Sequence, residues 1–285
     1  MPHKHLFFFI LARTKLNDMK LTVIGGGNMG LTFAKGIHAS GLLGNQISIL
    51  EKGEESLNRL KIQEKDFQVF DSPEKCIKEA DIIIVAVKPF HASEVFEGIK
   101  PFVNSNQLFI SLMAGVKMES IQLALGISKI VRTMPNLPAM IGKGMTGYTS
   151  SKDVSVSELE TVEKLLTSTG EAVKVDSEDD IDKITGLSGS GSAYVFYFME
   201  AMMNGADELG FNQEDSKKII IQTFEGAVEL FKQNGDTTSQ WIDKVCSKGG
   251  TTIAAINSFE KNKVNEHINQ GVRAAYDRAV ELGKE

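Results

Sequence analysis

The sequence predicts an α/β fold in two parts: an amino-terminal domain built on a mostly parallel sheet, and an all-α carboxyl-terminal domain. Strand and helix patterns alternate through the first half of the chain, which is typical of an open sheet with helices on both faces. From Ile181 onward the strand patterns vanish and long helical patterns take over. We expect domain limits at 19–178 and 179–285.

Eight runs of apolar and β-branched residues predict the strands. They are Leu21–Ile24, Gln46–Leu50, Val69–Phe70, Asp81–Val87, Leu108–Met113, Lys129–Thr133, Met145–Thr149 and Ala172–Val175. The fourth run is apolar after its first residue, as expected of a parallel strand that is buried on both faces. Helices are predicted between the strands, at Leu31–Ser40, Glu54–Lys65, Ser72–Ala80 and Ser157–Leu166.

The second half of the chain predicts only helices, after a hinge-like Gly/Ser stretch at residues 186–191. They cover Ala193–Leu209, Gln213–Gln233, Gln240–Cys246, Thr251–Phe259 and Val264–Gly283. The first of them is apolar nearly all round, which is typical of a buried helix. In a domain this small, we expect it to be buried in an interface between subunits.

Composition excludes several classes of function. The net charge of −6 gives no general attraction to nucleic acid or to an anionic membrane. Cys76 and Cys246 lie far apart without a C-x-x-C spacing, which favours free thiols in a reducing cytoplasm. The histidines are scattered, so we predict no metal site.

The amino-terminal residues 1–18 are predicted to be an extension outside the fold. The apolar run Leu6–Ala12 is too short to span a bilayer, and no cleavage site of a signal peptide follows it. Met19 lies directly before the first strand and could be the true start. A membrane anchor is the alternative for this segment.

The most informative motif is Gly25-Gly26-Gly27-Asn28-Met29-Gly30, a G-x-G-x-x-G between a strand and a helix. Gly25 permits a tight turn, Gly27 lets a pyrophosphate approach the backbone, and Gly30 lets the helix pack on the strand. The helix N-terminus adds free N–H groups for the phosphates. The motif predicts a Rossmann-type site for a dinucleotide cofactor, NAD(H) or NADP(H), and hence hydride transfer, with a flavin as the alternative.

The choice between the two cofactors stays open at this point. Glu51 ends the second strand, where an acid accepts hydrogen bonds from the ribose hydroxyls and repels a 2′-phosphate. Lys52 follows it and Arg59 lies on the next helix, and either could meet such a phosphate. A solvated Glu51–Lys52 pair without a ligand is the alternative.

Two further loops follow the carboxyl ends of parallel strands, where ligands bind in such sheets. They are Val87-Lys88-Pro89 and Ala114-Gly115, and we expect both to contact the nicotinamide half of the cofactor. Ordinary strand-to-helix turns would explain each loop singly. The loop at Asn136, between two prolines, is predicted to be structural.

A second glycine-rich element, Ser247-Lys248-Gly249-Gly250-Thr251-Thr252, opens a predicted helix. Its bare N–H groups could hold a small anion such as a carboxylate. Thr251 or Thr252 could donate a hydrogen bond to a reacting nitrogen or oxygen. A plain helix cap is the alternative, since Ser, Thr and Gly are common there.

Together these motifs resemble the pyrroline-5-carboxylate reductase family, from about Met19 to the end of the chain. The specific ones are Gly186–Tyr194 and the segment 247–252, because a generic dehydrogenase does not carry both. The family usually has Pro where this chain has Ser192 and Lys248, and often Thr where it has Cys246. These departures concern the rigidity of the loops more than the activity.

The resemblance implies that the helical domain interlocks with its twin in a homodimer, sometimes within a larger ring of dimers. It implies reduction of 1-pyrroline-5-carboxylate to L-proline by NADPH or NADH, in the cytoplasm. Thr252 would face the ring nitrogen as the catalytic residue, and Ser247, Gly249, Gly250 and Thr251 would hold the carboxylate.

Three alternatives remain. Another imine or β-hydroxyacid reductase of the same build is the nearest, although hydroxyacid enzymes normally place a Lys on the long central helix and Ala193–Leu209 has none. A non-catalytic dinucleotide-binding regulator would not need the carboxylate site. An assembly protein that uses only its helical half would leave the first half unexplained.

Overall fold

The computed structural model describes residues 18–44, 46–233 and 235–283, and divides into two compact units. The first unit runs to Ser190 and resumes from Ala275, and the second extends from Gly191 to Ala274. The extension predicted at 1–18 lies outside the described residues except for its last position. The predicted domain limits follow sequence patterns rather than packing, and they stay a prediction.

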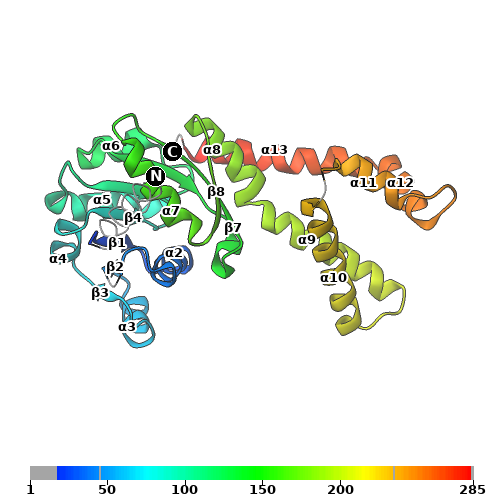
Figure 1. The fold of residues 1–285 in the computed structure, drawn as a ribbon, viewed down its shortest axis with the longest axis horizontal. Coiled ribbons are helices and arrows are strands. Elements are labelled where there is room, and N and C mark those ends of the chain that lie inside the picture. The colour runs from blue at the N-terminus through cyan, green and yellow to red at the C-terminus, as the bar shows by residue number, and fades with distance from the viewer. Residues whose placement is uncertain (1–17, 45, 234, 284–285) are drawn as a thin grey trace, which may run out of the picture. The chain divides into compact units, whose positions relative to one another are not determined.

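The first unit is built on an eight-stranded sheet in the order β3-β2-β1-β4-β5-β6-β7-β8 (Figure 1). The strands are β1 (Leu21–Ile24), β2 (Ile47–Leu50), β3 (Gln68–Phe70), β4 (Ile82–Val85), β5 (Leu108–Ser111), β6 (Ile130–Met134), β7 (Gly144–Ser150) and β8 (Gly170–Lys174). All neighbours are parallel except β6 and β7, which are antiparallel. The predicted, mostly parallel sheet is therefore confirmed, and the chain changes direction across the sheet between β1 and β4.

The central strands are apolar on both faces because helices cover both. In β4, Ile82 and Ile84 belong to one core cluster, while Ile83 and Val85 belong to the other. All four are completely buried. This period of two is the geometry of a strand, in which successive side chains point to opposite faces.

Six helices flank this sheet. Residues of α2 (Asn28–Ser40), α3 (Glu54–Gln63) and α7 (Val156–Thr167) pack into the first cluster. Residues of α4 (Pro73–Lys78), α5 (Ala92–Ile99) and α6 (Met118–Leu125) pack into the second. The sequence did not predict α5 or α6, which are short helices of eight residues. Short 3₁₀ turns occupy Pro89–His91, Lys100–Phe102 and Leu137–Ile141.

The helix α8 (Glu178–Ile184) is tied to β6 by a buried charge network. Arg132 on β6 is only 1% exposed, and its guanidinium donates to the carboxylates of Asp182 and Glu178. Burial raises the pKa of Asp182, and the adjacent Arg132 acts in the opposite direction. The stretch predicted to be hinge-like forms a π-helical turn at Thr185–Gly189, directly after α8.

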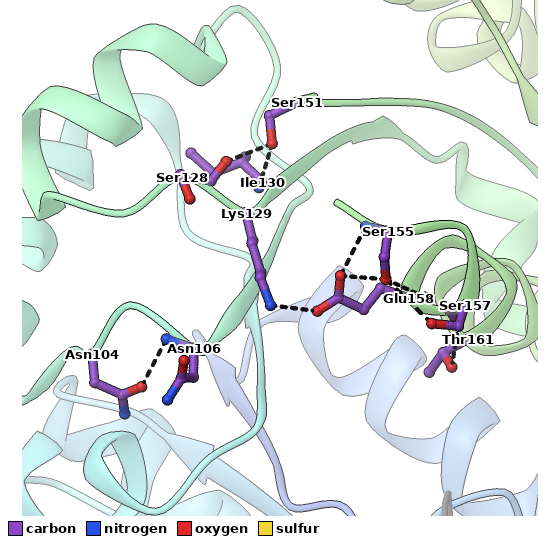
Figure 2. Close-up of polar contacts among 10 residues, drawn as sticks. All are labelled: Asn104, Asn106, Ser128, Lys129, Ile130, Ser151, Ser155, Ser157, Glu158 and Thr161. Atoms are coloured by element: carbon purple, nitrogen blue, oxygen red, sulfur yellow. Dashed lines mark hydrogen bonds and ion pairs between the residues drawn. The ribbon is translucent and has the colours of Figure 1, made fainter. Parts of the chain in front are cut away.

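Polar side chains fix the antiparallel pair of β6 and β7 at the end where β6 begins and β7 finishes (Figure 2). Ser151 Oγ donates to the carbonyl of Ser128 at 2.6 Å and accepts from the N–H of Ile130 at 3.0 Å. Lys129 pairs with Glu158 at 2.8 Å, and Glu158 also closes a capping box with Ser155 at the start of α7. The ion pair therefore joins the entrance of β6 to the first turn of α7.

The second unit contains helices α9 (Gly191–Glu208), α10 (Gln213–Gln233), α11 (Thr238–Val245) and α12 (Thr251–Lys261), and most of α13 (Val264–Leu282). Within the described residues it contains no strand, as predicted. The structure describes all of α9 and finds none of its residues buried, and Phe196 is 59% exposed. The single chain thus leaves much of this apolar helix uncovered, in agreement with its predicted place in a subunit interface.

The two cysteines, Cys76 and Cys246, are free thiols, as predicted. Burial raises the pKa of Cys76 to about 11. Among the described residues, no helix combines the length and the apolar character that crossing a membrane would need.

We predict that Arg132→Met destabilises the protein by about 3–5 kcal/mol, because it leaves the carboxylate of Asp182 buried without its cation. The double variant Arg132→Met/Asp182→Leu should recover part of this loss, since it removes both charges. The midpoint of urea denaturation, followed by circular dichroism, measures both. A single variant as stable as the parent would contradict the role assigned to the pair.

We predict that Glu158→Gln lowers stability at pH 7 by about 0.5 kcal/mol, because Gln preserves the capping box but loses the ion pair. Burial disfavours the charge on Glu158, but hydrogen bonds from Lys129 and Ser155 outweigh it and hold the pKa of Glu158 below its ordinary value. A lowered pKa in the folded state gives stability that is complete above the unfolded value of about 4.3 and is lost as pH falls. Thermal melts of the two proteins should therefore converge in acid, and a difference that persists there would count against the charge.

Candidate functional site

The glycine loop lies where the chain switches direction, at the carboxyl ends of β1 and β4. Gly25 has a φ of +98°, and a Cβ there would lie 2.8 Å from the carbonyl oxygen of Ala86. A Cβ on Gly30 would overlap the carbonyl of Gly25. Both glycines are therefore needed for the turn and for the close packing of α2 on β1, as the motif predicts.

Gly27 differs from its neighbours in the loop. It is the N-cap residue of α2, with extended backbone angles of −72° and −174°. Apart from Gly27 and its two chain neighbours, no heavy atom of the described residues lies within 4 Å of a Cβ built on it. The space above Gly27 and the free N–H groups of the first turn of α2 together form a cradle for an anion.

A cavity of about 430 Å³ opens beside this loop. Four predicted cofactor residues line it: Gly25, Glu51, Lys52 and Val87. The lining residues that the sequence did not assign to the cofactor include Pro73, His91, Glu94, Val95 and Gly98. Apart from Pro73 they lie on or just before α5, which the sequence did not predict. A correct prediction of this helix would have placed them at the carboxyl end of β4.

Glu51 is held by the backbone on both of its oxygens. Oε2 accepts from the N–H of Gly26 at 2.9 Å, and Oε1 accepts from the N–H of Gly53 at 2.9 Å. Lys52 pairs instead with Glu94, at 3.3 Å. Glu51 and Lys52 therefore do not pair with each other, and the Glu51 carboxylate ties the glycine loop to the turn after β2.

The other predicted cofactor residues lie near this edge of the sheet in different settings. Asn28 and Met29 form the first turn of α2, and the Met29 side chain packs on the core. Lys88 is the N-cap residue of the 3₁₀ turn that begins at Pro89, in the loop that follows β4.

The Ala114-Gly115 loop follows β5 and meets the end of α13. Gly115 has a φ of +76°, and a Cβ there would lie 2.9 Å from the Cβ of Leu282. The backbone of this loop is therefore packed closely from one side.

Asn136 has the structural role that the sequence predicted. Its side-chain oxygen accepts from the N–H of Met145 at 2.9 Å, and its amide donates to Ser188 at 3.1 Å. It joins the end of β6 to β7 and to the π-helical turn. Sequence patterns missed the charge network of Arg132, because its partners lie 46 and 50 residues further along the chain.

The second glycine-rich element lies in the second unit, at the start of α12. Gly249 has a φ of +73°, and Gly250 is the N-cap residue and donates its N–H to the carbonyl of Ser247 at 3.0 Å. Thr251 and Thr252 occupy the first turn, with Thr251 exposed and Thr252 half-buried. The predicted anion site thus has a helix N-terminus, a left-handed glycine and two hydroxyls next to one another.

These residues fit a dinucleotide on structural grounds. The open position at Gly27 is a cradle that a side chain would fill, and the adjacent cavity has room for the adenosine part of the cofactor. The donors at the start of α2 suit a pyrophosphate. Bound there, the cofactor supplies the hydride and the protein supplies its position.

Comparison with family models gives two matches. Residues 178–282 match the model described as pyrroline-5-carboxylate reductase dimerisation. Residues 20–115 match the model described as NADP oxidoreductase, coenzyme F420-dependent. The second match covers the glycine loop, and the first covers the segment 247–252 and the apolar helix α9.

Whole-chain comparisons agree with these matches. The chain is 33% identical over 272 residues to pyrroline-5-carboxylate reductase of Pseudomonas aeruginosa, covering 95% of this chain and 99% of the relative. The structure of the Plasmodium falciparum pyrroline carboxylate reductase with NADP bound is similar, with a TM-score of 0.85, 30% identity and coverage of 94% and 99%. The structure of a pyrroline-5-carboxylate reductase from Coxiella burnetii is also similar, with a TM-score of 0.85 and 33% identity. The match covers 94% of this chain and 100% of that structure. The chain therefore belongs to the pyrroline-5-carboxylate reductase family of NAD(P)H-dependent oxidoreductases.

Proposed function

We propose that this chain reduces 1-pyrroline-5-carboxylate to L-proline with NAD(P)H, as the last step of proline synthesis. The observation that carries the proposal is the combination of two anion sites: the open cradle at Gly27 and the glycine-rich N-terminus of α12. The first suits the pyrophosphate of a dinucleotide, and the second suits the carboxylate of a small substrate.

The reaction adds a hydride from the reduced nicotinamide to the imine carbon. The C=N double bond becomes a single bond, and the nitrogen, protonated beforehand, ends as the amine of proline. Because a protonated imine is already electrophilic, the protein needs little acid–base machinery, and most of its contribution is positioning.

Each predicted site residue has a role in this scheme. Ser247 and the glycine-rich turn at Gly249, Gly250 and Thr251 would hold the carboxylate. Thr252 would place its hydroxyl against the ring nitrogen. The loops at residues 87–89 and 114–115 would border the nicotinamide, while Glu51 and Lys52 would lie at the adenosine ribose.

We propose the same division of labour for the two predicted domains. Residues 19–178 would bind the cofactor, and residues 179–285 would bind the substrate and form the dimer. The match to a dimerisation model supports self-association, and the uncovered face of α9 provides the apolar surface for it. We further propose that dimers assemble into a larger ring and act in the cytoplasm, which the two free thiols favour.

The oxidation of NADH or NADPH, followed by absorbance, tests the proposed function. Activity with 1-pyrroline-5-carboxylate and none with a panel of 2-ketoacids and 3-oxoacids is the expected result. The reverse pattern would favour a hydroxyacid reductase, and cofactor binding without turnover of any of these compounds would favour a regulator.

We predict that Gly27→Val abolishes dinucleotide binding and leaves the fold intact. The position has room for a side chain in the protein alone, and its backbone angles are open to valine, but the side chain would occupy the place of the pyrophosphate. Titration of NADH and NADPH fluorescence, with a thermal melt as control, measures both effects. Gly30→Ala should instead lower the melting temperature, because its Cβ overlaps the carbonyl of Gly25.

We predict that Thr252→Ala lowers kcat about 10²-fold with little change in the affinity for the cofactor, because it removes one positioned hydrogen bond at the reacting nitrogen. Thr252→Ser should recover most of the activity. Thr251→Ala is the matched control in the same turn and should raise KM for the substrate more than it lowers kcat. Unchanged kinetics of Thr252→Ala would refute its assignment.

A further inference from the structure

The carboxylate of Glu51 is fixed in one orientation on the wall of the cavity beside the glycine loop. The N–H groups of Gly26 and Gly53 reach its two oxygens from two different segments, both at 2.9 Å. Each oxygen of a carboxylate has a further lone pair, so the group can still accept a hydrogen bond from a ligand. Glu51 is therefore a pre-positioned acceptor that carries a negative charge.

The charge around this acceptor is negative. The titratable side chains that line the cavity are Glu51, Glu94, Lys52 and His91, and the histidine adds a positive charge only when it is protonated. Glu54 and Glu55 follow immediately in the first turn of α3. A phosphate monoester brings a further charge of about −1.5 to −2 at pH 7 and would be repelled here.

Lys52 is the cation that could offset this repulsion. Its Nζ lies 3.3 Å from the carboxylate of Glu94, so it can meet a phosphate only by leaving that partner. Arg59 is exposed on α3, and the described residues that line the cavity include no arginine. The two-pronged guanidinium contact that favours a phosphate is thus missing from this wall.

A ribose with a free 2′-hydroxyl is attracted to this wall rather than repelled. Its hydroxyls are donors, and an ionised carboxylate is an acceptor only. We propose that Glu51 makes this protein prefer NADH to NADPH, by offering its fixed carboxylate to the adenosine ribose and by repelling a 2′-phosphate. The proposal rests on the proposed function, since it assumes that a dinucleotide binds at the glycine loop.

Fluorescence titration of the full-length protein with NADH and with NADPH, without substrate, tests this preference directly. In the parent protein we expect the Kd for NADH to be at least about tenfold lower than that for NADPH. Glu51→Gln keeps the shape of the side chain but removes its charge and replaces one acceptor oxygen with a donor. It should weaken NADH binding about tenfold and leave NADPH binding unchanged or tighter.

Glu94→Gln is the matched variant, since the Glu94 carboxylate is exposed and contacts Lys52 rather than the glycine loop. It removes one negative charge and releases Lys52, so the Kd for NADPH should fall several-fold while that for NADH stays constant. Melting temperatures of all variants check the fold. If Glu51→Gln lowers the melting temperature sharply, its Kd values no longer report on cofactor preference. The Kd values of Glu94→Gln for NADH and NADPH then test the proposal alone.

The possible outcomes separate this proposal from the proposed function. Equal affinities, or tighter binding of NADPH by the parent protein, would overturn the role of Glu51 in cofactor choice while turnover of 1-pyrroline-5-carboxylate still stood. A Glu51→Gln variant that weakens both cofactors by the same factor would reduce Glu51 to a support of the loop. Failure of both dinucleotides to bind the parent protein would overturn the proposed function as well.

Discussion

The close approach of α2 to β1 is the constraint on which the amino-terminal half depends. Gly25 turns the chain at a positive φ against Ala86, and Gly30 lets the new helix pass over the carbonyl of that turn. A side chain at either position would push the helix away. With the helix in place, its N-terminus opens at Gly27 toward the edge of the sheet where β1 and β4 diverge. The anion site is therefore a consequence of packing, and its specificity comes from what surrounds it.

Glu51 has a structural role in the loop and a proposed role in the choice of cofactor. Its two oxygens hold the glycine loop and the turn after β2 together, so the same bonds that stabilise the loop also fix a negative charge on the wall of the cavity. The Arg132 network likewise holds two segments together, because it joins β6 to α8 through Glu178 and Asp182. Both are polar contacts between segments distant in sequence, and in both the carboxylates have hydrogen-bond donors, which is what allows them to be partly or fully buried.

The helical half has a different physical problem. The apolar helix α9 buries none of its described residues within one chain, yet it carries large apolar side chains such as Phe196. Self-association solves this problem, in agreement with the match to a dimerisation model over residues 178–282. The glycine-rich turn before α12 belongs to the same unit as α9, so the proposed substrate site and the helix proposed for self-association lie on the same set of helices.

The sequence by itself determined the elements whose signals are local. The run at residues 81–87 predicts a doubly buried strand, the glycine loop predicts a turn and a helix N-terminus, and all eight strands occur within two residues of their predicted ends. The tertiary structure alone decided what depends on partners far along the chain. The sequence did not decide whether Glu51 would contact a ribose, a lysine or the backbone. It did not predict α5, which brings Glu94 to the cavity just after His91. It also did not indicate that Arg132 would be buried against α8. Hydrogen bonds and charge pairs of this kind depend on distances in space, and periodicity along the chain carries no record of them.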